Sequence, residues 1–128
     1  MADGGVNPTL GSQFATGLAA KDFDRVRALL HPEIDFRGMT PNRIWEARDP
    51  DTLITEILQM WFEPSDDILS LDALETGEVG ARQRVGWRFS VRNPDGLHTV
   101  EQQAYLEERD GRIGWMRVMC SGFQPVQN

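Results

Sequence analysis

Two residues of opposite charge, Arg88 and Glu101, form the arrangement in this sequence that is best suited to chemistry. If residues 93–96 (Asn-Pro-Asp-Gly) form a hairpin loop, these two side chains lie opposite each other on antiparallel strands. In a pocket shielded from water, a guanidinium can hold a carboxylate or an enolate while a glutamate acts as the general base. On a solvated or interface face, the same residues would form an ordinary cross-strand ion pair. Both interpretations stay open at this point.

Polar side chains continue along the face that carries Glu101. Gln103 and Tyr105 follow at alternate positions, where side chains leave the same side of a strand. Asp110-Gly111 is typical of a two-residue turn, and counting outward from it brings Cys120 opposite Glu101. Because a neighbouring carboxylate raises the pKa of a thiol, Cys120 is predicted to be a small buried side chain and not a nucleophile.

Three antiparallel strands within residues 79–121 must position these groups. The register set by the first hairpin pairs Phe89 with Val100, Val85 with Ala104 and Arg82 with Glu107, so apolar and charged partners match together. Counting from the second turn places Gln103 opposite Val118 and Tyr105 opposite Met116. The predicted apolar face holds Trp87, Phe89, Val91, Val100, Leu106, Trp115 and Met119. The predicted mixed face holds Arg84, Arg88, Ser90, Glu101, Gln103, Tyr105, Met116, Val118 and Cys120.

Helices dominate the first half of the chain. Apolar residues at helical spacing predict a helix from Pro8 to Ala20, with Asn7 as its N-cap, and a shorter helix that begins after Asp22 and ends at residues 31–32. Asp49-Pro50 opens a third helix that runs to about Phe62. Strands are predicted at 33–38, 43–47, 68–74 and 79–92, with a turn at 76–77. Helices followed by a run of antiparallel strands indicate an α+β fold.

Size and composition limit the range of functions. A chain of 128 residues with 40% hydrophobic residues predicts one domain, 1–128, whose residues 1–7 form a flexible N-terminus. The net charge of −7 argues against nucleic acid as a partner. One cysteine and two histidines without ligand spacing predict no metal site, and no cofactor motif is present. No stretch is long and apolar enough to span a membrane, so we expect a cytoplasmic protein.

Several segments resemble the NTF2-like superfamily, which includes ketosteroid isomerases, SnoaL-type polyketide cyclases, limonene epoxide hydrolases and scytalone dehydratases. The resemblance covers about residues 8–122 and is carried by 14–24, 29–36, the third helix and 110–113. It implies a cone-shaped curved antiparallel sheet wrapped around three N-terminal helices, with an apolar pocket inside. It also implies a homodimer formed through the other side of the sheet.

The resemblance does not extend to the known catalytic groups. The position that matches the isomerase oxyanion-hole tyrosine is Phe14, and the one that matches the catalytic aspartate is Gly38. Gln103 stands where the second oxyanion donor, a protonated aspartate, is expected. The acid that cyclases carry near the end of the last strand is absent from residues 119–122. We therefore predict a small-molecule-binding domain without isomerase or cyclase residues, and the alternative is an isomerase, cyclase or lyase that uses Glu101 for proton transfer and Arg88 for orientation.

The resemblance also implies which residues surround a ligand. The mixed face would line the pocket, so the predicted ligand-binding residues are Phe14, Phe36, Ile57, Trp61, Gln103, Tyr105, Met116, Val118 and Cys120. The apolar face, with Trp87, Phe89 and Trp115, would then form the homodimer contact. Hydrophobic patterning alone favours the reverse, with the apolar face packed under the helices. We predict the arrangement that the resemblance implies.

Overall fold

The computed structural model describes residues 8–126, and the predicted flexible segment 1–7 lies outside them. The helical elements are α1 (Leu10–Ala19), α2 (Phe23–Ala28), α3 (Pro50–Thr52), the π-helical η2 (Leu53–Leu58) and α4 (Gln59–Trp61). The strands are β1 (Leu30–Thr40), β2 (Arg43–Ala47), β3 (Asp67–Val79), β4 (Arg82–Asn93), β5 (Gly96–Arg109), β6 (Arg112–Cys120) and β7 (Gln124–Pro125). No helix within 8–126 is long and apolar enough to cross a membrane.

Side-chain caps explain where the helices begin. As predicted, the side chain of Asp22 caps α2 by accepting a hydrogen bond from the backbone N–H of Arg25. Asp49 caps the third helix in the same way, by accepting from the backbone N–H of Thr52, and Pro50 stands in its first turn, also as predicted. Helix α1 is capped by Thr9, and the predicted cap Asn7 lies outside the described residues. Helix α2 ends at Ala28, so residues 31–32, predicted to end it, belong to β1. The third helix is continuous through α3, η2 and α4 to Trp61.

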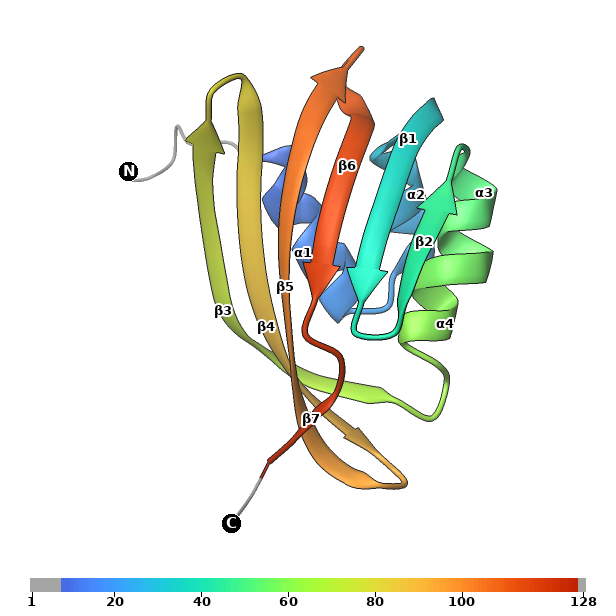
Figure 1. The fold of residues 1–128 in the computed structure, drawn as a ribbon, viewed down its shortest axis with the longest axis vertical. Helices are drawn as coiled ribbons and strands as arrows, with labels where there is room; N and C mark the ends of the chain where they lie inside the picture. Colours follow the sequence, from blue (N-terminus) through green and yellow to red (C-terminus); the bar gives the residue numbers. More distant parts are fainter. Residues whose placement is uncertain (1–7, 127–128) are drawn as a thin grey trace.

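The sheet has the order β2-β1-β6-β5-β4-β3, with the short β7 paired to β5. Its neighbours are antiparallel except β1 and β6, which run parallel, so the sheet is mixed and not wholly antiparallel as predicted. It curves across one side of the helices (Figure 1). The helical elements and this open curved sheet confirm the predicted α+β cone.

The register of β4 and β5 agrees with the prediction. Arg88 pairs with Glu101, Phe89 with Val100 and Val85 with Ala104. The preceding turn differs, because β3 continues to Val79 and the chain reverses at Gly80, whose positive φ of 59° suits a tight turn. The predicted turn at 76–77 is therefore wrong.

A bulge changes the register of β6. Asp110 and Gly111 form the predicted two-residue turn, with positive φ at both positions. Glu108 then pairs with Ile113 but Glu107 pairs with Trp115, so Gly114 is an extra residue on β6. The shift pairs Gln103 with Met119 and Tyr105 with Arg117, where Val118 and Met116 were predicted. Beyond the bulge, Met116, Val118 and Cys120 therefore share a face with Leu106, Ala104 and Gln102, and not with Gln103 and Tyr105 as predicted.

The core lies between the helices and one face of the sheet. Trp87 and Phe89, predicted to face outward, are 2% and 0% exposed. The Trp87 ring lies 5.8 Å from that of Phe14 on α1, and Phe89 lies 5.7 Å from Phe62, directly after α4. The expected outward position of these two aromatic residues is wrong, because the helices can bury more apolar area against this face than against the charged one.

Trp61 packs against Gly38 where the inner face of β1 meets the third helix. A Cβ atom built on Gly38 would lie 2.7 Å from the indole carbon Cη2 of Trp61. The same indole contacts Phe36, with 6.2 Å between ring centroids, and meets Trp45 edge-on at 6.1 Å. The position that matches the catalytic aspartate of ketosteroid isomerases is thus covered by an indole ring.

We expect Gly38→Ala to lower the free energy of unfolding by about 1–3 kcal/mol, because the added methyl group overpacks a rigid ring and backbone. Urea denaturation measures the change. Gly77→Ala is the matched control, since its new Cβ would meet only the guanidinium end of Arg84, at 3.3 Å. Equal stability of the Gly38→Ala variant and the unaltered protein would show that Trp61 is not held against this strand.

Candidate functional site

Arg88 and Glu101 pair in register but do not form the predicted pocket site. Both residues are exposed on the outer face of the sheet, away from the helices, and no ion pair joins them in residues 8–126. Their neighbours Trp87 and Gln102 take the inward direction, since successive side chains leave opposite faces of a strand. The prediction that Arg88 and Glu101 carry chemistry inside the cone is therefore wrong.

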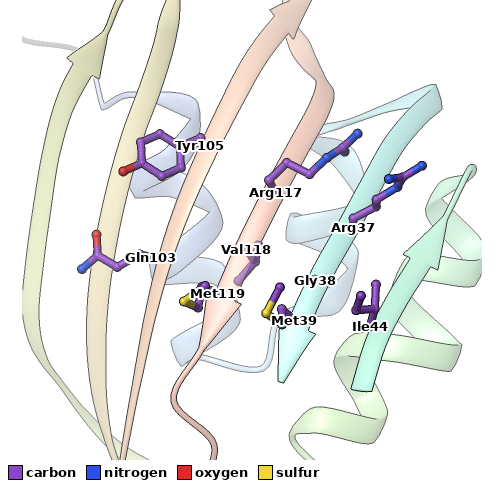
Figure 2. A pocket seen from close by; sticks show the side chains of 9 residues that line it. All are labelled: Arg37, Gly38, Met39, Ile44, Gln103, Tyr105, Arg117, Val118 and Met119. Atoms are coloured by element: carbon purple, nitrogen blue, oxygen red, sulfur yellow. The ribbon is translucent and has the colours of Figure 1, made fainter. Parts of the chain in front are cut away.

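Gln103 and Tyr105 also lie on the outer face, which corrects their predicted place in the cone. Both line an open groove of about 610 Å³ that crosses β5, β6, β1 and β2. Its lining residues are Arg37, Gly38, Met39, Ile44, Gln103, Tyr105, Arg117, Val118 and Met119. Figure 2 shows Met39 and Met119 in the middle of the groove, with Tyr105 and Gln103 on one side and Ile44 on the other. The groove is apolar along its centre.

The two arginines of the groove already have carboxylate partners. Arg117 lies 3.3 Å from an Asp35 oxygen and donates to the Asp35 backbone carbonyl at 2.9 Å, and its guanidinium stacks on Trp115. Arg37 is 3.7 Å from Glu46. Since these charges are neutralised within the same face, the groove has no free cationic centre that would select an anion.

The other predicted lining residues lie on the side of the sheet that faces the helices. They are Phe14, Phe36, Ile57, Trp61, Met116, Val118 and Cys120; each is at most 9% exposed, and Val118 also borders the outer groove. The bulge at Gly114 is the reason that the three β6 residues point inward while Gln103 and Tyr105 point outward. The structure thus brings seven of the nine residues together around the core.

Gln102 is the polar residue of the core that sequence reasoning missed. Its side chain is 0% exposed, and its Oε1 accepts a hydrogen bond of 2.8 Å from Nε1 of Trp87. Its Nε2 has no partner. The signal was present in the sequence, because Gln102 stands between Val100 and Ala104 on the apolar side of a regular alternation.

Acid–base groups are scarce in the core. Asp66 is the one buried carboxylate among residues 8–126, and it accepts from the Glu63 backbone N–H and from Asn93. His31 contacts Asp110 at 3.2 Å, and His98 packs edge-on against Phe123. The described residues contain no group of three metal-ligating side chains. Within residues 8–126 the core therefore offers apolar walls and hydrogen-bonding groups, and its one buried carboxylate already accepts two hydrogen bonds.

Solved structures of similar shape identify the architecture. An LEH-like epoxide hydrolase from M. tuberculosis has 18% sequence identity and a TM-score of 0.63, and covers 88% of this chain and 80% of its own. An inferred isomerase from Bacillus subtilis has 13% identity and a TM-score of 0.70, covering 84% and 81%. An NTF2-like protein from Burkholderia thailandensis has 15% identity and a TM-score of 0.65, covering 88% of each chain. No protein-family model and no curated protein matches the sequence. At these identities the likeness shows the fold alone, and it confirms the predicted NTF2-like fold.

Asp72 gives the outer face a measurable pH dependence. Hydrogen bonds from Ser70 and then Ser90 lower the pKa of its carboxyl, burial opposes them slightly, and the charge of Arg88 adds to the lowering. A carboxyl whose pKa is lower in the folded state stabilises the fold above its unfolded pKa, and this contribution is lost as the pH falls through the folded pKa. The contribution is therefore full at neutral pH and disappears in the acid range below the ordinary value of 3.8.

We expect Asp72→Asn to be less stable than the unaltered protein at about pH 7 and to approach it as the pH falls through the lowered pKa of Asp72, below which both side chains are uncharged. Urea denaturation at several pH values measures the difference. Asp67→Asn, an exposed β3 carboxylate without these hydroxyl partners, serves as the control. A difference for Asp72→Asn that does not change with pH would contradict the assignment.

Proposed function

We propose that this chain is a single NTF2-like domain that binds a small organic molecule between its helices and the inner face of its sheet. The observation that carries the proposal is Gln102, a fully buried amide with an unpartnered donor in an otherwise apolar layer. Leaving a buried donor without a partner costs about 1–3 kcal/mol, so it is rarely kept without a role. Binding a molecule that accepts from this donor would supply that role.

Binding is favoured over proton-transfer catalysis. The alternative enzyme depended on Glu101 within the cone, and this carboxylate is exposed on the opposite face. The buried carboxylate Asp66 already accepts hydrogen bonds from two donors, so both of its oxygens are engaged. The epoxide hydrolase and the inferred isomerase named above share the shape, while this core carries apolar and amide groups in the corresponding layer.

The test uses prodan, a neutral fluorescent ketone that responds to the polarity of its surroundings. We expect saturable binding with a blue-shifted emission. Cys120→Trp should abolish binding, because it fills the inner layer next to Gln102. Met119→Trp, which adds a similar ring to the adjacent residue on the outer face, should retain it. Loss of binding in Met119→Trp with retention in Cys120→Trp would assign the site to the outer groove and contradict the proposal.

We also propose that two copies of the chain associate through the outer face of the sheet. Three large apolar side chains are exposed along the groove, with Met39 46%, Ile44 61% and Met119 59% accessible. Contiguous apolar surface of this kind marks contact sites in proteins. Six strands at a spacing of ~4.8 Å and a length of ~30 Å give a face of roughly 800 Å², which is what each partner of a standard interface buries.

Charge favours a second copy of the chain as the partner for this face. Four ion pairs lie across it, namely Arg37–Glu46, Arg82–Glu107, Arg84–Glu75 and Arg117–Asp35. These pairs make the face neutral overall, although the whole chain has a net charge of −7. Two copies of an acidic chain repel each other least where they meet through a neutral surface. A basic partner would instead bind the rest of the protein surface, which carries the net negative charge. The dimer contact proposed here includes Trp115 but not Trp87 or Phe89.

Sedimentation velocity at micromolar concentration tests the association. We expect the unaltered chain to sediment as a dimer and Met119→Glu to sediment as a monomer, because each copy would bury an unpaired carboxylate in the contact. Met60→Glu is the matched control, since Met60 is similarly exposed at 55% but lies on α4. A monomer for the unaltered chain, or dissociation caused equally by both variants, would contradict the use of this face.

A further inference from the structure

Lys21 lies at a position where the backbone favours glycine. It follows Ala20, the C-cap of α1, and its φ of 53° is in the left-handed region. The N–H of Lys21 donates to the carbonyl of Leu18, and the N–H of the next residue donates to the carbonyl of Gly17, as is usual where a helix ends in this way. A side chain is strained in this conformation, whereas glycine is not. Because strain of this kind is found mainly where a side chain has a role, Lys21, the one lysine of the chain, is a candidate for binding.

The amino group of Lys21 is held in place but its charge is not neutralised. Nζ donates a hydrogen bond of 2.7 Å to the backbone carbonyl of Glu63, which directly follows the third helix and Phe62. Among residues 8–126, no carboxylate oxygen lies within 4.0 Å of this nitrogen. An ammonium group has three N–H donors, so two of them are left after this bond. The position can therefore receive an anionic acceptor.

This amino group borders an open groove of about 620 Å³ on the helical side of the molecule, which we call the Lys21 groove. The groove lies between the α1–α2 connection and the C-terminal half of the third helix. Its lining residues are Lys21, Phe23, Thr55, Gln59, Met60, Phe62, Glu63 and Pro64. None of them lines the groove on the outer face of the sheet. A volume of this size accommodates a small organic molecule.

Hydrocarbon forms most of the walls of the Lys21 groove. Met60 is 55% exposed, which is high for a large apolar side chain. Phe62 is 2% exposed and packs on Phe89 of the sheet at 5.7 Å between ring centroids, so it has a fixed place beside the groove. Phe23 is half-buried and packs against the core. These side chains offer a ligand an apolar surface next to one positive charge.

Charge limits the ligand to a single negative group. The exposed carboxylate of Glu63 also belongs to the lining, and the whole chain has a net charge of −7. A polyanion such as a nucleotide would therefore be repelled. One carboxylate can instead accept from the ammonium group through short, charge-assisted hydrogen bonds. Thr55 adds no free donor, because its hydroxyl donates to the backbone carbonyl of Asp51.

From the uncompensated ammonium group and the apolar walls, we infer that the Lys21 groove binds a small monocarboxylate with a hydrocarbon tail, such as a medium-chain fatty acid. The carboxylate accepts from the two remaining donors of Lys21 Nζ, while the tail lies against Phe23, Met60 and Phe62. The Glu63 carbonyl positions the amino group. This site is separate from the binding proposed for the inner layer of the sheet, and either can exist without the other.

Methionine methyl groups report on the candidate sites separately. Met60 lines the Lys21 groove, Met39 and Met119 line the outer groove, and Met116 lies in the core. The full chain, labelled with ¹³C at the methionine methyl groups, is titrated with octanoate and followed by NMR. We expect a saturable shift of the Met60 signal, with the Met39 and Met119 signals unchanged. Shifts at Met39 and Met119 without one at Met60 would place octanoate in the outer groove and overturn the inference.

The core signal distinguishes this inference from the proposed function. A shift of Met116 without one of Met60 would support binding in the inner layer and contradict binding in the Lys21 groove. A shift of Met60 without one of Met116 would support the Lys21 groove, and it says nothing against the inner layer. If no methionine signal moves, the Lys21 groove does not bind a monocarboxylate and the inference is wrong.

Two probes of the same chain length test the role of charge. Octanol is neutral and octylammonium is cationic. We expect octanoate to bind several-fold more tightly than either, since it alone brings a negative charge to the ammonium group of a partly exposed lysine. Equal affinity of octanol and octanoate, both measured from the Met60 signal, would show that the ammonium group has no part in binding.

Variants assign the preference for octanoate to Lys21. Lys21→Met removes the charge and should abolish the preference over octanol. Arg25→Met removes a nearby cation that does not line the groove, and it should leave the preference intact. Lys21→Gly should also lose the preference while staying folded, because glycine adopts this backbone conformation without strain. Glu63→Gln removes the like charge and should tighten octanoate binding several-fold. A preference that persists in both Lys21 variants would overturn the inference.

Discussion

Burial of Trp87 beneath α1 decides which faces of β4 and β5 point toward the helices. Its ring packs 5.8 Å from Phe14, and its indole N–H bonds to the Gln102 amide on the neighbouring strand. Because side chains alternate, the inward position of Trp87 turns Arg88 outward, and through the strand pairing it turns Glu101 outward as well. A full indole buried against helices stabilises the fold by a few kcal/mol, which far exceeds what an exposed ion pair contributes.

Turn chemistry predicted much of this architecture from the sequence. Residues 93–96 and Asp110-Gly111 are local turn signals. The register counted outward from these turns agrees with the structure for β4 and β5, and for β5 and β6 as far as Glu108. The bulge at Gly114 has no comparable signal, since a glycine inside a strand is compatible with a regular ladder as well as with a bulge. This one extra residue puts Met116, Val118 and Cys120 on the same face as the apolar residues of β4 and β5. It puts Trp115 and Met119 on the face of Gln103 and Tyr105.

The choice of faces could not be made from the resemblance. Hydrophobic patterning favoured the apolar face under the helices, and the structure agrees with it for β4 and β5. The two faces now separate two kinds of chemistry. The inner one combines apolar walls with the unpartnered donors of Gln102 and Trp61, and the outer one combines exposed methionines with neutralised arginines.

The parallel pairing of β1 with β6 also determines how the chain must fold. Phe36 and Met116 are neighbours in the sheet although they stand near opposite ends of the chain, so β1 gains this neighbour only after β6 has been synthesised. Contacts of such long sequence separation slow folding, because a large loop must close before they form. Until then the β1–β2 hairpin has an unpaired strand edge. Through this edge the nascent chain can aggregate or be recognised by chaperones.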